Sequence, residues 1–203
     1  MKKLLAVGAL LAVSAAHAQL AYTGGTQTPF VGDYSAPPVL TPDFAEGLVD
    51  PTIWSLGDNP LRVTFLGKEA AHIDQFILNG SLVLDNLASA PTSYGPFALS
   101  AGALDFKFKD TSDGSEVPNG GNLLAFASYA VLGSFDEAGA FTPWAGYSGE
   151  FQYVIGFNDG AKVDADYDDL VIGITAIPEP ETYALMLAGL AAVGFMARRR
   201  KVQ

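Results

Sequence analysis

Five aspartates lie close together in the segment "GFNDGAKVDADYDDLVIGI", residues 156–174, with Lys162 as the only basic residue among them. The five are Asp159, Asp164, Asp166, Asp168 and Asp169. Carboxylates this close repel one another, and a hard cation with oxygen ligands relieves the repulsion. The segment therefore predicts a calcium site, and Ca²⁺ is the one cofactor that the sequence suggests.

The spacing of these aspartates resembles an EF-hand only in part. Asp164, Asp166 and Asp168 have the D-x-D-x-D spacing of the first half of the loop. Asp169 occupies the sixth position, where glycine is required, and Thr175 the twelfth, where glutamate is required, so an EF-hand is excluded. An acidic turn before a strand, with Asp side chains capping backbone amides, is the alternative explanation.

Residues for other catalytic chemistry are scarce. The chain has no cysteine, which excludes thiol nucleophiles, disulfides and thiolate metal sites. His72 is the only histidine that remains once an N-terminal signal is removed, and no serine lies in a G-x-S-x-G motif, so His72 is predicted to be structural. We predict no enzymatic activity. A carboxylate pair for glycoside hydrolysis stays open, since 20 acidic residues lie within residues 19–177.

Two tryptophans are candidates for contact with sugars. Trp54 and Trp144, the second in "FTPWAGY", could form an aromatic platform for sugar rings, and packing in the core is the alternative.

Hydrophobic patterning predicts the strands that hold these residues. "LDFKFKD" alternates Leu104, Phe106 and Phe108 with charged residues, as a half-buried strand requires. Asn79-Gly80 lies between two β-rich runs and predicts a hairpin. Further strands are expected in the sequences "NLLAFASYAVLGSF", "EFQYVIGF" and "DLVIGIT". Residues 19–177 are therefore predicted to form an all-β domain, a β-sandwich or jelly roll.

The charge of this domain limits its partners. Within residues 19–177 five basic residues stand against 20 acidic ones, a net charge of −15. Such a domain repels nucleic acid and anionic lipid headgroups and attracts divalent cations.

The N-terminus has the features of a secretory signal peptide. Lys2 and Lys3 precede an apolar stretch, residues 4–13, and Ala16-His17-Ala18 forms an A-x-A cleavage site before Gln19. Residues 1–18 are therefore predicted to direct the chain to the secretion machinery and to be removed.

The C-terminus has the features of a short membrane anchor. Pro178 and Pro180 favour an exposed linker, and the uncharged run at residues 183–197 predicts a transmembrane helix shorter than the usual ~20 residues. The basic cluster at residues 198–201 places this end in the cytoplasm, so the domain is expected outside the inner membrane.

Residues 178–201, "PEPETYALMLAGLAAVGFMARRRK", resemble the PEP-CTERM sorting tail of exported bacterial proteins. The residues that carry the resemblance are Pro178, Glu179 and Pro180, the short apolar helix, and Arg198, Arg199 and Arg200. The resemblance implies that a membrane enzyme, the exosortase, processes the chain near the Pro-Glu-Pro box, and that the protein then reaches the cell surface. Residues 178–203 are interpreted as this tail.

The segment "DADYDDLV" resembles a D-x-D-Y-[ND]-D-[LM]-V sequence of exported β-sandwich domains that carry such tails, some of which are proposed to bind calcium. The sequence thus favours a non-enzymatic protein of the cell surface or extracellular matrix, stabilised by Ca²⁺. A carbohydrate-binding or adhesion module for extracellular polysaccharide is the alternative, and a glycan-acting hydrolase the third.

Overall fold

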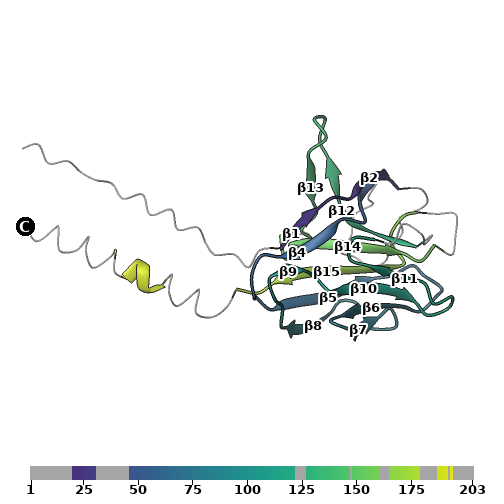
Figure 1. Cartoon of the computed structure of the whole chain (residues 1–203), viewed down its shortest axis with the longest axis horizontal. Coiled ribbons are helices and arrows are strands. Elements are labelled where there is room, and N and C mark those ends of the chain that lie inside the picture. Colours follow the sequence, from purple (N-terminus) through teal and green to yellow (C-terminus); the bar gives the residue numbers. More distant parts are fainter. Residues whose placement is uncertain are drawn as a thin grey trace, which may run out of the picture.

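The protein consists of β-strands arranged in antiparallel sheets (Figure 1). This computed structural model describes residues 20–30, 46–121, 127–146, 148–160, 165–178, 187–191 and 193. The all-β class predicted from the sequence is confirmed, since the described strands extend from Leu20 to Ala176 and pair only antiparallel.

The largest sheet runs in the order β2-β3-β12-β14-β15-β5-β8, and β13 pairs with the end of β12. Its strands are β2 (Thr26–Pro29), β3 (Glu46–Val49), β12 (Ser128–Phe135), β14 (Tyr153–Asn158), β15 (Leu170–Ala176), β5 (Leu61–Gly67), β8 (Thr92–Phe97) and β13 (Phe141–Pro143). We call it the large sheet.

Two smaller sheets complete the described strands. One has the order β11-β10-β6-β7, with β11 (Glu116–Pro118), β10 (Phe106–Asp110), β6 (Asp74–Leu78) and β7 (Ser81–Asp85). The other has the order β1-β4-β9, with β1 (Leu20–Thr23), β4 (Thr52–Ser55) and β9 (Gly102–Ala103).

The main hydrophobic core lies between the large sheet and the two smaller ones. Alternate residues of the central strands of the large sheet, such as Val63, Ile155 and Ile172, pack against Phe76 and Phe108 of the four-stranded sheet. The sheets thus form two layers around this main core. We call the two-layered arrangement the sandwich. Burial of these side chains is the main stabilising contribution, at roughly 1.5–3 kcal/mol for each large apolar residue.

The opposite face of the large sheet is also covered in its centre. Leu66, Val154 and Val171 lie there beneath Tyr167 and the partly buried Trp144. Because both faces of the central strands are buried, β14 and β15 consist largely of apolar residues instead of alternating apolar and polar ones.

Local patterns predicted several strands correctly. The alternation in "LDFKFKD" forms β10, with Phe106 and Phe108 buried and Lys107 and Lys109 half-buried. The β6–β7 hairpin turns at Asn79 and Gly80, which have φ values of 51° and 72°. Positive φ at both central residues is the requirement of a type I′ turn, which explains the choice of Asn-Gly.

A hydrogen-bond network around Asn119 joins the layers. The Asn119 side chain accepts from the Ile53 N–H at 2.8 Å and donates to the carbonyls of Ile53 and Leu104, each at 2.8 Å. The Tyr129 hydroxyl donates to Asn119 Oδ1 at 3.1 Å and also contacts the carbonyl of Pro51. The network therefore connects β4, the segment before β10, and β12.

The β12–β13 hairpin projects beyond the sandwich (Figure 1). Its turn is held by Asp136, whose Oδ1 accepts hydrogen bonds from the N–H groups of Ala138 and Ala140 at 2.9 and 2.8 Å.

Within the predicted tail, residues 187–191 and 193 are helical. Among the residues that the structure describes, no helix combines the length and the apolar character needed to cross a membrane. Most of the predicted anchor, the signal peptide and its cleavage residues Ala16, Ala18 and Gln19 lie outside the described residues.

Candidate functional site

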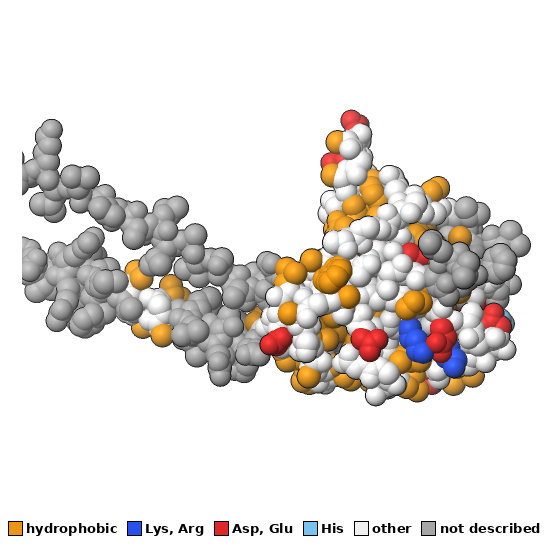
Figure 2. Space-filling model, viewed as in Figure 1, with side chains coloured by type: hydrophobic (Ala, Val, Ile, Leu, Met, Phe, Trp, Pro, Cys, Tyr) orange, Lys and Arg blue, Asp and Glu red, His pale blue; other side chains and the backbone are white. Residues whose placement is uncertain are grey.

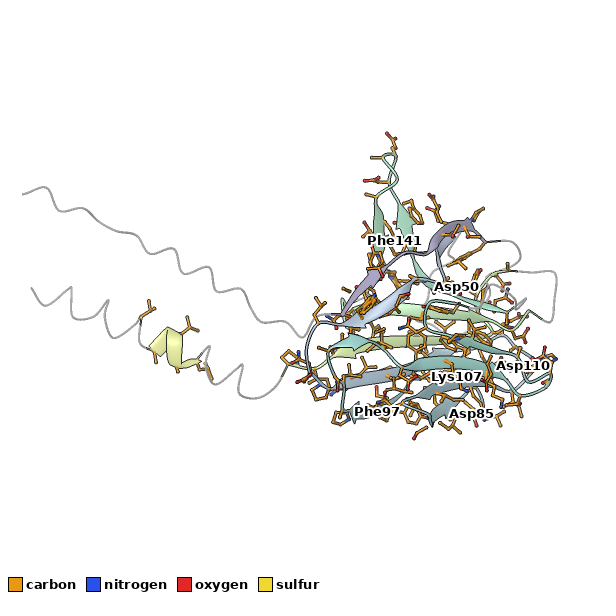
Figure 3. The ribbon with its side chains drawn as sticks, viewed as in Figure 1. Asp50, Asp85, Phe97, Lys107, Asp110 and Phe141 are labelled. Carbon is orange, nitrogen blue, oxygen red and sulfur yellow. The ribbon has the colours of Figure 1, made fainter. Side chains whose placement is uncertain are left out.

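One end of the sandwich gathers acidic side chains from several strands. β10 and β14 end there, at Asp110 and Asn158, and β6 and β15 begin there, at Asp74 and Leu170. Antiparallel pairing produces this arrangement, because the end of one strand lies beside the start of its neighbour. Figure 3 shows Asp110 at this end, which we call the acidic end.

The acidic end is buried although it is polar. Its buried acidic residues are Asp74, Asp110, Asp159, Asp166, Asp168 and Asp169. Buried carboxylates are rare without partners, so their concentration at one place identifies the strongest candidate site in the described part of the chain.

Two groups of side chains could each hold a metal ion. The first is His72, Asp110 and Asp159, and the second is Glu69, Asp166 and Asp168. Within each group the donor atoms lie no more than 4.8 Å from one another. We call them the histidine group and the oxygen group, since only the first offers a nitrogen ligand.

In the histidine group, His72 lies between two carboxylates. Its Nδ1 atom is 2.9 Å from Asp110 Oδ2 and 3.3 Å from Asp159 Oδ2. The hydrogen bond to Asp110 raises the pKa of His72. In Figure 2 the pale blue histidine is visible beside red acidic side chains at the right edge of the molecule.

Asp74 adds a further carboxylate to this end. It lies directly opposite Asp110 on neighbouring strands and has no exposed surface. Burial, and then the carboxylates of Asp159, Asp169 and Asp110, raise the pKa of Asp74 to about 8. Its Oδ2 accepts from Asn86 Nδ2 at 3.2 Å, whereas Oδ1 has no hydrogen-bond partner among the described residues.

The oxygen group depends on the loop before β15. The Glu69 N–H donates to the carbonyl of Asp168 at 2.9 Å, which links this loop to the end of β5. Tyr167 has φ of 62° and packs over the large sheet, and its hydroxyl is 3.1 Å from Ser128 Oγ. Gly156 lies beneath it, where a Cβ would overlap the carbonyl oxygen of Tyr167.

The basic residues of β10 do not neutralise the acidic end. Lys107 and Lys109 alternate with the buried phenylalanines and pair with Glu116 at 2.7 and 3.6 Å. Figure 2 shows blue side chains beside a red one on this face of the four-stranded sheet. Asp110, two residues after Phe108, keeps the inward direction of that side chain and is buried with it.

The structure divides the five aspartates of the predicted calcium site. Asp159 joins the histidine group, while Asp166 and Asp168 join the oxygen group. Asp169 Oδ2 accepts from the Asp159 N–H at 2.8 Å, which is the amide capping that the alternative explanation expected. Asp164 lies outside the described residues.

Sequence reasoning missed four members of the acidic end, namely Glu69, His72, Asp74 and Asp110. A signal for two of them was present, because the period of two that buries Phe76 and Phe108 places Asp74 and Asp110 on the same inward face.

The two tryptophans lie on different surfaces. Trp54 is 37% exposed, and its Nε1 donates to Thr23 Oγ1 at 2.9 Å. Trp144 is half-buried and packs against Leu66, Val154 and Val171 on the face of the large sheet that points away from the main core. We call this the far face.

A groove of about 640 Å³ lies on that far face, beside β5 and β8. Its lining combines polar and apolar side chains and consists of Arg62, Thr64, Leu66, Pro91, Ser93, Glu150, Phe151 and Thr175.

Comparison with known proteins identifies the C-terminal end. The family model of the PEP-CTERM protein-sorting motif matches residues 176–201. Comparisons with curated proteins and with solved structures gave no match. Pro178 is described, while Glu179, Pro180 and the three arginines of the motif lie outside the described residues. The chain therefore carries a PEP-CTERM sorting tail at its C-terminal end.

Proposed function

We propose that this chain is a non-enzymatic protein of the cell surface or extracellular matrix, delivered by its tail and stabilised by Ca²⁺. The observation that carries the proposal is the sorting motif at residues 176–201. This motif implies export and handling by the exosortase, whereas the destination and the calcium ion are our inference.

The short apolar run suits a temporary anchor. Residues 183–197 fall short of the ~20 residues of a stable transmembrane helix, and the basic cluster that follows holds their orientation. A helix that only presents the Pro-Glu-Pro box to a membrane enzyme does not need to be a durable anchor. Processing near Pro178 would then release the folded domain.

The direction of β15 places the acidic end far from the point where the tail attaches. The tail follows Ala176 at the end of β15, while the acidic end lies at the start of that strand, near Leu170. The seven residues of this strand span about 20 Å. The acidic end therefore points away from the attachment point, which reduces its repulsion from anionic headgroups.

Calcium is proposed at the oxygen group. Asp168 has no exposed surface and Asp166 is buried, and both lie with Glu69 within reach of a single ion. Carboxylate oxygens are the ligands that Ca²⁺ prefers. An ion there would join the end of β5 to the loop before β15 and so stiffen the domain.

Intact-mass measurement of protein from the medium and from membranes tests the proposal. We expect a chain that begins at Gln19 and ends close to the Pro-Glu-Pro box in the medium. Replacing Pro178, Glu179 and Pro180 with alanine should retain the full tail in the membrane fraction. A wild-type chain that stays in membranes and ends at Gln203, in cells that possess the exosortase, would contradict it.

A carbohydrate-binding module is the second candidate, favoured by the exposed ring of Trp54 beside the hydroxyl of Thr23. Exposed aromatic rings next to polar groups are suited to stacking against sugars. Binding of the purified protein to extracellular polysaccharide of the producing cells should then fall in Trp54→Ala. Leu56→Ala is the matched control, since Leu56 is also an exposed apolar residue, at 60%.

A further inference from the structure

The imidazole of His72 and two buried carboxylates converge at the acidic end. Nδ1 of His72 lies 2.9 Å from Asp110 Oδ2 and 3.3 Å from Asp159 Oδ2. One ring nitrogen carries at most one proton, so it cannot donate fully to both oxygens. Donor atoms this close can bind one ion at bonds of about 2.0–2.2 Å.

The carboxylate of Asp110 is held in position by the backbone. Its Oδ1 accepts from the Ser112 N–H at 2.6 Å, while Oδ2 faces His72. Hydrogen bonds of this kind orient the ligands of metal sites and maintain their affinity.

Asp74 supplies an independent observation. It is fully buried, it lies directly opposite Asp110, and its Oδ1 has no hydrogen-bond partner in the described part of the chain. A buried oxygen without a partner shows that polar groups at this end of the domain are not fully satisfied, and a cation bound at Asp110 would supply positive charge near it.

The ligand types indicate which ion fits. Imidazole nitrogen suits Zn²⁺ and other first-row transition metals, whereas a group of oxygens alone suits Ca²⁺. His72 is 36% exposed, so an ion has access from solvent. We propose that His72, Asp110 and Asp159 form a binding site for a divalent transition-metal ion of the Zn²⁺ class, separate from the oxygen group.

This inference goes beyond the proposed function, because it concerns other residues and another class of ion. Titration calorimetry of the full-length chain with Zn²⁺ and, separately, with Ca²⁺ tests it. His72→Ala should weaken Zn²⁺ binding by more than about tenfold, since even outer-shell changes cost roughly 10–100-fold. The same variant should leave Ca²⁺ binding unchanged. Asp168→Asn should weaken Ca²⁺ binding and leave Zn²⁺ binding unchanged.

His17→Ala is the matched control, because His17 is the other histidine of the chain. Circular dichroism checks that each variant is folded, and Asp159→Asn provides a second test if His72→Ala does not fold. The proposal is overturned if wild-type protein binds no Zn²⁺, if His72→Ala binds it normally, or if His17→Ala loses it equally. Loss of Ca²⁺ binding in His72→Ala would instead assign His72 to the calcium site. It would overturn the proposal that the histidine group and the oxygen group are separate sites.

Discussion

The backbone N–H of Asp159 donates to Oδ2 of Asp169, 2.8 Å away, and this bond joins the end of β14 to the start of β15. The carboxylate of Asp169 therefore acts as a hydrogen-bond acceptor for the backbone. The neighbouring Asp166 and Asp168 belong to the oxygen group. One run of sequence therefore contributes to both groups of possible metal ligands.

Removal of an oxygen-group carboxylate should abolish stabilisation by calcium. At a hundredfold excess over Kd, a single bound ion stabilises the folded state by about 2.7 kcal/mol. We expect Ca²⁺ to raise the melting temperature of the wild type but not of Asp166→Asn. The exposed Asp105 provides the control Asp105→Asn, which should respond as the wild type does. An equal rise in melting temperature in Asp166→Asn and the wild type would show that calcium does not bind at the oxygen group.

Asp50 should make stability depend on pH. Burial raises the pKa of Asp50, so the folded state holds this proton more tightly than the unfolded chain does. Its contribution to the free energy of unfolding is present below the ordinary pKa of 3.8 and is lost as pH rises through the folded pKa.

Asp50→Asn should therefore melt at a higher temperature than the wild type at pH 7, and the difference should vanish well below the ordinary pKa. Asparagine keeps the Oδ1 acceptor for the Tyr129 N–H and tolerates the φ of 51°. Thermal unfolding across this pH range measures the difference. A difference independent of pH would show that titration of Asp50 is not its cause.

Asn119→Ala should destabilise the sandwich by about 3 kcal/mol, because a buried polar group left without a partner costs roughly 1–3 kcal/mol. The lost bonds are those to Ile53 and Leu104. Tyr129→Phe should cost less, since it removes only one hydroxyl from the network. Tyr94→Phe, at a half-buried tyrosine, is its control. Equal unfolding free energies for Asn119→Ala and wild type, by denaturant titration, would contradict the role of the network.

Gly156→Ala should displace the loop that carries the oxygen group. The added Cβ would overlap the carbonyl oxygen of Tyr167, and such overpacking costs roughly 1–3 kcal/mol or more. We expect a lower melting temperature together with weaker Ca²⁺ binding. Gly57→Ala is the control, since a Cβ there meets only the end of the Asn59 side chain. A calcium affinity equal to that of the wild type would show that Tyr167 does not position the loop.

Several strands of the domain could be predicted from local patterns. Alternation predicted β10, and Asn79-Gly80 predicted the β6–β7 hairpin, because side-chain direction in a strand and φ in a tight turn depend on nearby residues. The strand order could not be predicted, since β12 pairs with β3 and β14 across large separations in sequence.

The sorting tail, the acidic charge and the all-β class follow from the sequence alone, because they depend on composition and on residues adjacent in the chain. The membership of the two groups of possible metal ligands depends instead on the tertiary fold. Glu69, His72 and Asp110 reach the aspartates of residues 159–169 because antiparallel pairing brings distant strand ends together. No spacing within a single segment contains that information.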